Sequence, residues 1–250
     1  MNYKEIIMSK YAILSDIHGN LFALKEVMKD LNNQNIESII LLGDLIDYGM
    51  QSNEVIDFIK DNLSSKIICN IWGNHEKAIM TKDFNHFSSQ RGIDSAKFTE
   101  SQLTADSKDY LNNNLIHEGR YEFEIENKKV LAVHGSLNDF HWKAIFPDNL
   151  NGDYFDFDIV LSGHSHYPHV FQHFYDADNP DMRNKKAVLF INPGSVGQPR
   201  NHNPNAQYAI LDTDSMGVEL RYVKYPNDKA MNLYDGSIDD FYRLRLENGI

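Results

Sequence analysis

The sequence predicts an α/β fold in which two β-sheets pack face to face with helices on the outside. Two observations carry this prediction. Over residues 11–72, short apolar runs that are typical of buried strands alternate with segments of helical periodicity. From residue 120 onward, the pattern changes to strands that are joined by short turns. Alternating strands and helices imply parallel strands with right-handed crossovers, whereas strands joined by short turns imply antiparallel pairing.

The first part of the chain contains three expected strands and two expected helices. The strands span residues 11–15, 38–42 and 66–72, and the helices span residues 21–31 and 53–59. In the first helix the apolar residues recur at the spacing of one helical face, which is the signal for an amphipathic helix packed on a sheet. This order predicts a parallel unit at the start of the fold.

Residues 75–115 are polar, have helical spacing and show no strand signal. We therefore expect a helical insertion at about residues 76–115, placed beside any site that the strand ends form. Such an insertion would form a wall over the pocket. The alternative is that it forms a contact between two copies of the chain, so a homo-oligomer is a possible assembly.

The second part of the chain contains the expected antiparallel strands. The first two span residues 121–126 and 129–133 and are joined by a turn. Further strands are expected at residues 159–162, 186–191, 207–212 and 218–224. The expected last element is a helix at residues 238–247 with an apolar face. We find no internal repeat and no linker, so we expect one domain that covers residues 1–250.

Composition and charge exclude several classes of protein. The 250 residues carry a net charge of −12, which argues against a stable nucleic-acid-binding surface because such binding depends on Lys and Arg. No apolar run is long enough to cross a bilayer, and the first ten residues lack the apolar core of a signal peptide. The single cysteine, Cys69, excludes an internal disulfide and fits a reducing compartment. We therefore expect a cytoplasmic protein without membrane contact.

Polar clusters follow five of the expected strands, where ligands bind in open α/β sheets. Aspartate oxygens and imidazole nitrogens without a thiolate suit first-row divalent ions such as Mn, Fe, Zn or Co. Bound ions would also supply the local positive charge that an anionic substrate needs on an acidic protein. The candidate residues are Asp16 and His18, Asp44 and Asp47, Asn74 and His75, His134, and His164 and His166.

The order of these clusters resembles that of the calcineurin-like metallophosphoesterase superfamily. The motifs are Asp-x-His, Gly-Asp-x-x-Asp, Gly-Asn-His-Glu, a single His and Gly-His-x-His, and they span residues 16–166. Residues 192–200, Asn-Pro-Gly-Ser-Val-Gly-Gln-Pro-Arg, are similar to the segment that closes the site in the small bacterial phosphodiesterase and dinucleoside polyphosphate hydrolase branch. The resemblance implies a four-layer αββα sandwich of two mixed β-sheets flanked by helices.

The resemblance also implies two divalent metal ions, with Mn or Fe expected and Zn, Co or Ni as alternatives. Two ions about 3.5–4 Å apart activate a bridging water as hydroxide and clamp the phosphoryl oxygens. Asp44 would bridge the two ions. The implied ligands are Asp16, His18, Asp44 and His166 for one ion, and Asp44, Asn74, His134 and His164 for the other.

His75 is the candidate general acid for the leaving group, and Asp47 is suited to orient its ring. The alternative for Asp47 is a helix N-cap. Asn74 is also a candidate substrate contact. Ser195 could contact a phosphate, although a tight turn explains it nearly as well.

Two positions depart from the pattern of the protein phosphatases and symmetric dinucleoside tetraphosphatases. Where these relatives have arginines that grip the substrate phosphate, this chain has Tyr48 and Trp72. The difference favours a pocket that binds phosphate with Arg200 and stacks a flat group on an aromatic ring.

The expected function is hydrolysis of a small phosphorylated substrate, such as a phosphodiester or a nucleotide polyphosphate like diadenosine tetraphosphate. The alternatives are a phosphomonoesterase, including a Ser/Thr protein phosphatase, and a non-enzymatic scaffold of the same fold. The intact ligand set argues against a scaffold. His141 and His202 could line the pocket. The other histidines outside the motifs are expected to be surface or core residues, and these are His86, His117, His169 and His173.

Overall fold

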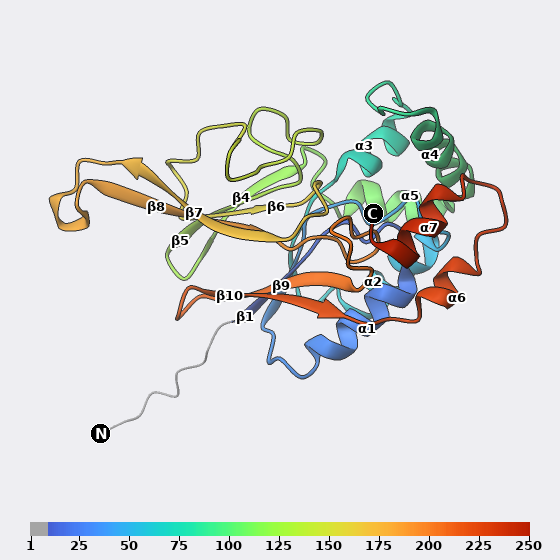
Figure 1. Ribbon diagram of the computed structural model, residues 1–250, viewed down its shortest axis with the longest axis horizontal. Helices are drawn as coiled ribbons and strands as arrows, with labels where there is room; N and C mark the ends of the chain where they lie inside the picture. Colours follow the sequence, from blue (N-terminus) through green and yellow to red (C-terminus); the bar gives the residue numbers. More distant parts are fainter. Residues whose placement is uncertain (1–9) are drawn as a thin grey trace.

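The computed structural model describes residues 10–250 (Figure 1). The prediction that the first ten residues do not form a signal peptide therefore falls almost entirely outside the described residues. Two five-stranded mixed sheets form the centre of the fold. The first has the strand order β10-β9-β1-β2-β3, in which β1, β2 and β3 are parallel and β9 and β10 are antiparallel to their neighbours. Its strands are β1 (Lys10–Leu14), β2 (Ser38–Leu41), β3 (Ile67–Asn70), β9 (Ala206–Asp212) and β10 (Gly217–Val223).

The second sheet has the strand order β4-β5-β6-β8-β7, with β5, β6 and β8 parallel. Strands β4 and β7 pair antiparallel to β5 and β8 at its two edges. The strands are β4 (Arg120–Ile125), β5 (Lys128–Val133), β6 (Ile159–Ser162), β7 (His169–Asp176) and β8 (Lys185–Asn192).

The sequence interpretation missed strand β7 and treated His169 and His173 as isolated residues. On this strand, half-buried His169, Phe171, His173 and Tyr175 alternate with exposed positions that include Phe174. Apolar and aromatic side chains therefore lie on both faces, so the strand lacks the apolar–polar alternation that identifies a half-buried strand.

The helices agree with the expected order, and the structure adds three details. The expected insertion is three helices, and a short helix, α6, was not expected. Helix α7 begins at residue 241 rather than 238, because the Asp235 and Asp239 side chains accept backbone N–H bonds from Ser237 and Phe241 and hold turns there. The helices are α1 (Leu21–Leu31), α2 (Ser52–Asn62), α3 (Asn74–Thr81), α4 (Gln90–Gln102), α5 (Ala105–Asn113), α6 (Asn227–Met231) and α7 (Phe241–Asn248), with a 3₁₀ turn at Pro180–Met182.

Apolar packing arranges these elements in layers. Leu24 of α1 and Ile56 of α2 belong to the core over the outer face of the first sheet, whereas Ile40 and Leu161 belong to the core between the sheets. The outer face of the second sheet is covered by the irregular segment 134–158, which contributes Tyr154 to the core there. Figure 1 shows helices around the first sheet and one end of the molecule, and irregular loops over the second sheet.

The prediction of two mixed sheets flanked by helices is confirmed, with the irregular segment 134–158 as the layer on the second sheet. Within residues 10–250, no helix has the length and apolar character that a membrane span requires. Strands β1, β2 and β3 run parallel in one sheet, and β5 and β6 run parallel in the other. The loops after their carboxyl ends carry the candidate site.

Candidate active site

The structure brings together all seven predicted metal ligands. They come from the loops after β1, β2, β5 and β6 and from the first residue of α3. Six of them are no more than 3% exposed, and the seventh, His164, is partly buried. Buried carboxylates and imidazoles are rarely placed together without a charge partner, so the cluster indicates a built binding site.

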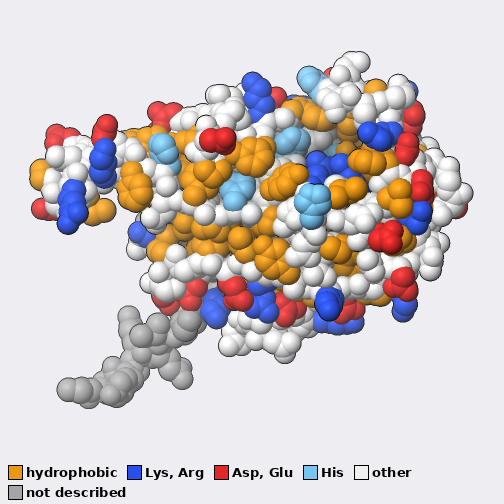
Figure 2. Space-filling view, in the orientation of Figure 1, with side chains coloured by type: hydrophobic (Ala, Val, Ile, Leu, Met, Phe, Trp, Pro, Cys, Tyr) orange, Lys and Arg blue, Asp and Glu red, His pale blue; other side chains and the backbone are white. Residues whose placement is uncertain are grey.

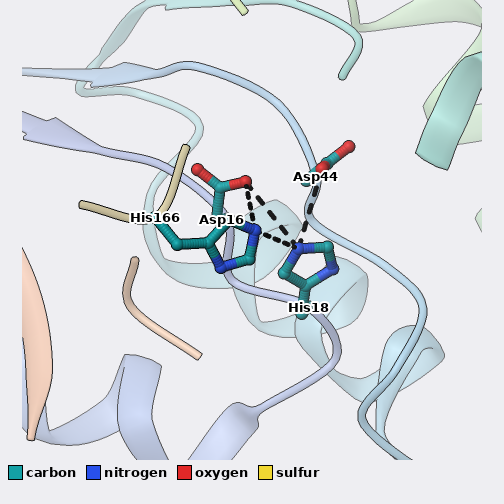
Figure 3. Close-up of side chains that lie close together, drawn as sticks. All are labelled: Asp16, His18, Asp44 and His166. Atoms are coloured by element: carbon teal, nitrogen blue, oxygen red, sulfur yellow. Dashed lines mark hydrogen bonds and ion pairs between the residues drawn. The ribbon is translucent and has the colours of Figure 1, made fainter. Parts of the chain in front are cut away.

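Four of these side chains form one compact group (Figure 3). Their candidate ligand atoms all lie within 4.8 Å of one another. His166 Nε2 is 3.1 Å from Asp16 Oδ1 and 3.2 Å from His18 Nε2. His18 Nε2 is 3.6 Å from Asp44 Oδ2. Two carboxylates and two imidazoles therefore converge on a single point.

Backbone carbonyl groups orient three of the imidazole rings. The Nδ1 atoms of His18, His134 and His166 lie 3.1, 2.7 and 2.6 Å from the carbonyl oxygens of residues 46, 42 and 198, respectively. A carbonyl oxygen can only accept a hydrogen bond, so each Nδ1 carries the hydrogen. This contact fixes the ring orientation and directs Nε2 into the cluster, as metal-binding histidines require.

The remaining ligands form a second group beside the first. Asn74 Oδ1 lies 3.0 Å from both His134 Nε2 and His164 Nδ1. His134 Nε2 is also 3.3 Å from Asp44 Oδ2, the same oxygen that faces His18. The other Asp44 oxygen, Oδ1, accepts a hydrogen bond from the His75 backbone N–H. One oxygen of Asp44 is thus shared between the two groups.

The donor set of the first group fits a divalent cation. Asp16 Oδ1 is buried and has no hydrogen-bond donor among residues 10–250, while Asp16 Oδ2 accepts bonds from Ser15 Oγ and the His164 backbone N–H. Burial lowers the pKa of both His18 and His166, so their facing Nε2 atoms are unprotonated. The lone pairs of Asp16 Oδ1, His18 Nε2 and His166 Nε2 therefore point at one another. A bound cation would accept all three and remove the repulsion between them.

The second group differs in its proton affinity. Burial lowers the pKa of His164 to about 3. Burial also acts to lower the pKa of His134, but the charge of Asp44 outweighs it and raises that pKa to about 9. His134 and Asp44 therefore form a tight ionic contact in the metal-free protein, and a cation bound there would replace the proton.

His75 and Asp47 form a buried pair next to the metal ligands. His75 Nδ1 lies 2.6 Å from Asp47 Oδ2, and His75 Nε2 faces Asp44 Oδ2 at 4.0 Å. Burial acts to lower the pKa of His75, but the charges of Asp44 and Asp47 outweigh it and raise the pKa. The other oxygen of Asp47 accepts hydrogen bonds from Ser95 Oγ at 2.7 Å and Thr99 Oγ1 at 2.9 Å.

Asp47 is therefore not a helix N-cap, which was the alternative interpretation, since the N-cap of α2 is Gln51. Its two hydroxyl partners lie on α4, inside the helical insertion. These two residues had no predicted role, because a Ser and a Thr in a polar helix belong to no motif. The insertion thus holds the orienting carboxylate in place.

Glu76 ties the loops after β2 and β3 together. Its carboxylate accepts backbone N–H bonds from Asp44, Leu45, Gly73 and, at 3.3 Å, Ile46; the first three are 2.7–2.8 Å long. Burial and then the charge of Asp44 raise the pKa of Glu76 to about 7. This residue was part of a motif in the sequence, but its structural role was not predicted.

Two glycines allow these loops to touch. A Cβ atom on Gly43 would lie 2.3 Å from the Gly73 nitrogen, and one on Gly73 would lie 2.1 Å from Asp44 Oδ1. Gly43 also has a φ of 91°, in the region that L-residues with side chains rarely adopt. A larger residue at Gly43 would have to displace the backbone of Gly73, and one at Gly73 would have to displace the Asp44 carboxylate.

Several site residues adopt left-handed backbone conformations. Such a conformation costs of order 1–3 kcal/mol for a residue other than glycine and persists where the surrounding structure determines it. Here the hydrogen bonds of the loops supply that constraint. The site residues with φ between 47° and 72° are Asp16, His18, Asp44, Asp47, Tyr48, His164 and His166.

A cavity of about 310 Å³ lies over the cluster. Its floor is formed by His75 and by four of the predicted metal ligands, which are Asp44, Asn74, His164 and His166. On the face shown in Figure 2, His side chains and Lys or Arg side chains lie together in a hollow between hydrophobic side chains.

The wall and the rim of the cavity have different origins. Tyr48 and Arg200, the candidate substrate contacts from the sequence, both line the cavity and form its wall next to the floor. The rim consists of His86, Phe87 and Ser88 from the loop between α3 and α4, and Trp142 from segment 134–158. His86 was interpreted as a surface or core residue, and the other three were not considered, because no motif contains them.

Two residues singled out from the sequence beside the site do not line the cavity. Ser195 does not line the cavity, because its hydroxyl donates to the Asp16 carbonyl and accepts from the Gln198 backbone N–H. Trp72 is also absent from the cavity lining; its Nε1–H donates to the Leu111 carbonyl and its ring stacks on His117. The aromatic side chains that line the cavity are Tyr48 in the wall and Phe87 and Trp142 on the rim.

His141 and His202 do not line the cavity either. His141 is buried, with Nδ1 facing Lys77 Nζ at 3.3 Å, and burial lowers its pKa to about 4. The prediction that these two could line the pocket is therefore not supported by their positions.

The fold and the buried Asp–His cluster define a class: a metal-dependent phosphoesterase. Comparison with known proteins agrees. The calcineurin-like phosphoesterase superfamily domain matches residues 10–216. Protein MJ0912 of Methanocaldococcus jannaschii is 32% identical over 235 residues, which cover 90% of this chain and 91% of that protein. The chain belongs to the calcineurin-like phosphoesterase superfamily, as its sequence motifs predicted.

More distant relatives show the same fold. Phosphodiesterase YfcE of Escherichia coli is 22% identical over 217 residues, which cover 84% of this chain and 91% of that protein. The crystal structure of a metallophosphoesterase from Sphaerobacter thermophilus superposes with a TM-score of 0.73 at 24% identity, covering 97% of this chain and all of the other. The prediction that the protein is a phosphoesterase is confirmed at the level of the family.

Proposed function

We propose that the protein is a dinuclear metal-dependent hydrolase of phosphodiesters or nucleotide polyphosphates. The observation that carries the proposal is the position of Asp44 Oδ2, which lies 3.6 Å from His18 Nε2 and 3.3 Å from His134 Nε2. A single oxygen that faces both ligand groups is suited to bridge two ions. Bound there, divalent ions such as Mn or Fe supply charge to the phosphoryl oxygens and lower the pKa of a water molecule.

His75 serves as the proton donor to the leaving oxygen. Because Asp47 accepts the Nδ1–H bond, the ring is held with Nε2 toward the cavity. Although burial acts to lower the pKa of His75, the charges of Asp44 and Asp47 raise it, which favours the protonated ring that can donate a proton where the leaving group develops negative charge. Asp47 is the positioning residue of the pair, and Ser95 and Thr99 hold it in turn.

The residues of the cavity wall favour a phosphodiester, in which phosphorus carries two substituents, over a phosphomonoester. Tyr48 is buried, and burial raises its pKa, so it is a neutral group at the position where related phosphatases carry a cation. Arg200 is the only Arg or Lys among the described residues that line the cavity. One guanidinium can bind a single non-bridging or neighbouring phosphate in bidentate fashion.

The rim favours a substrate with a flat group. Trp142 lies 6.5 Å from His164 and 5.3 Å from Phe87, measured between ring centroids. A base that stacks on such a ring gains about 1–3 kcal/mol. The name of YfcE, a phosphodiesterase, supports the diester class. We therefore place nucleotide substrates such as dinucleoside tetraphosphates ahead of phosphoproteins.

A substrate panel tests this proposal. The Mn-loaded protein is assayed against nitrophenyl mono- and diesters, cyclic nucleotides, dinucleoside tetraphosphates and phosphopeptides, with products identified. We expect kcat/KM for a dinucleoside tetraphosphate to exceed that for phosphopeptides by at least about 100-fold, or about 2.7 kcal/mol of transition-state binding. Phosphopeptides that match or exceed it would show that the site is a phosphomonoesterase.

A further inference from the structure

Three arginines gather beside the cavity wall in a protein of net charge −12. Arg91 comes from the first turn of α4, Arg200 from the loop after β8 and Arg245 from α7. Arg91 and Arg245 both stack on the ring of Phe241, with their guanidinium carbons 4.0 and 4.4 Å from its centroid. Three distant parts of the chain thus bring positive charge to one place.

These guanidinium groups lack acidic partners among residues 10–250. Three of the other four arginines are paired with carboxylates: Arg120 with Glu122, Arg221 with Asp30, and Arg243 with Asp240. In contrast, the Nε atoms of Arg200 and Arg245 are buried and make no hydrogen bond within the described chain. Burial and then the charge of Arg200 lower the pKa of Arg245 to about 10. Unpaired, partly buried like charges are unfavourable unless an anion compensates them.

The cluster continues from the cavity through aromatic rings. Tyr48 lines the cavity and stacks on Tyr242 with the ring centroids 4.3 Å apart. Arg245 lies over the Tyr242 ring at 5.9 Å, so it stands one ring beyond the wall. Arg200 itself lines the cavity. The arginines therefore extend away from the reacting centre rather than toward the metal ligands.

We propose that Arg91, Arg200 and Arg245 form a second anion subsite, which binds a phosphate group beyond the one that is hydrolysed. Guanidinium groups bind phosphate oxygens in bidentate fashion, and three of them match the charge of a polyphosphate chain. This inference deepens the proposed function and depends on it for the identity of the substrate. It narrows the substrate class to compounds with several linked phosphates.

Binding of inorganic tripolyphosphate to the metal-free full-length protein tests the subsite directly, because no turnover is needed. Isothermal titration calorimetry at low ionic strength compares the wild type with Arg245→Gln and Arg91→Gln. We expect each substitution to weaken binding by at least about 5-fold, since a charge-assisted hydrogen bond is lost. Arg243→Gln is the matched control, because Arg243 lies on the same helix and is paired with Asp240. It should bind within about two-fold of the wild type.

A second measurement connects the subsite to catalysis. The ratio of kcat/KM for a dinucleoside tetraphosphate to that for bis(p-nitrophenyl) phosphate should fall at least about 10-fold in Arg245→Gln and stay unchanged in Arg243→Gln. If the protein hydrolyses no nucleotide polyphosphate but Arg91→Gln still loses tripolyphosphate binding, the proposed function fails and the anion subsite stands.

Two results would overturn the inference. One is wild-type affinity for tripolyphosphate in both Arg91→Gln and Arg245→Gln. The other is an equal loss in Arg243→Gln, which would indicate a general effect of surface charge. If Arg245→Gln does not fold by circular dichroism, Arg91→Gln decides, because Arg91 is exposed. If the two arginines only pack against Phe241, Arg91→Gln and Arg245→Gln should lower the melting temperature and leave the affinity for tripolyphosphate unchanged.

Discussion

The floor and the rim of the cavity are built in opposite ways. On the floor, Asp44 and His166 are at most 2% exposed, and hydrogen bonds to the backbone fix their orientation. On the rim, His86 and Ser88 are exposed, and Trp142 is held through ring contacts with His86 and Phe87 at 5.5 and 5.3 Å. The floor therefore has one arrangement, whereas the rim depends on a few side-chain contacts.

This difference separates chemistry from selection of the substrate. A change on the floor alters the position of charges, which act steeply with distance in a buried site. A change on the rim removes contact area from a substrate that the floor still positions. We expect the effects of substitution to decrease from the floor to the rim, and four predictions test that order.

Asp44→Asn should have the largest effect. The amide lacks the charge needed to bridge two cations, so we expect most of the bound metal to be lost and kcat/KM to fall by at least about 10³-fold. Metal analysis by mass spectrometry on purified protein measures the first effect, and a diester assay measures the second. Asp57→Asn, on the exposed side of α2, is the control. Full metal occupancy with full rate in Asp44→Asn would refute the assignment.

His75→Ala should keep its metal and lose turnover. We expect kcat to fall by about 10²-fold for substrates with basic leaving groups and by less for nitrophenolate, which needs little protonation. Metal content and kcat are measured for a series of diesters that differ in leaving-group pKa. Equal losses across the series would indicate that His75 positions the phosphate instead of donating a proton.

Ser95→Ala combined with Thr99→Val should have an intermediate effect. The double change removes both hydroxyl bonds to Asp47 Oδ1, so the carboxylate is held less firmly against His75. We expect kcat to fall by about 10-fold with little change in KM, and the loss should depend on the leaving group in the same way as for His75→Ala. Ser101→Ala is the control on the same helix, since the exposed Ser101 hydroxyl donates to the Phe98 carbonyl and accepts from Gln102 Nε2. A loss that is uniform across leaving groups would argue for a general folding effect.

Trp142→Ala should have the smallest effect. Removing the ring should raise KM for nucleotide substrates by about 5-fold, at the low end expected for base stacking, and leave kcat nearly unchanged. Trp142→Phe should retain most of the affinity, because it keeps an aromatic face. Steady-state kinetics with a dinucleoside tetraphosphate and with bis(p-nitrophenyl) phosphate provide the comparison. A proportional rise in KM for both substrates would show that the ring does not recognise a base.

The same division explains how much of the site could be predicted from the sequence. The ligands were found because each follows a strand whose carboxyl end is recognisable, as with Asp16 after β1 and His134 after β5. The direction of a parallel strand determines where such a residue lies. Residues that act across long sequence separations gave no such signal, and Thr99, 52 positions after Asp47, is the clearest case.

Other differences have local physical causes. Strand β7 was missed because both of its faces carry apolar side chains. Trp72 stands beside a motif, where relatives have an arginine, but its ring belongs to the core and its Nε1–H donates to the Leu111 carbonyl of α5. The rim was missed because exposed residues in an irregular loop have no periodicity that reports their position. Packing across the whole molecule decides these cases.

The close contact between Gly43 and Gly73 shows how such a site can lose activity by mutation. Either glycine can become a larger residue through one nucleotide change, and the new Cβ would then displace the Asp44 carboxylate or the loop that carries it. A descendant altered at either position would retain every metal-binding side chain and still lose activity. For this protein and others with the same loop contact, the presence of every metal-binding side chain is therefore not sufficient for an active site.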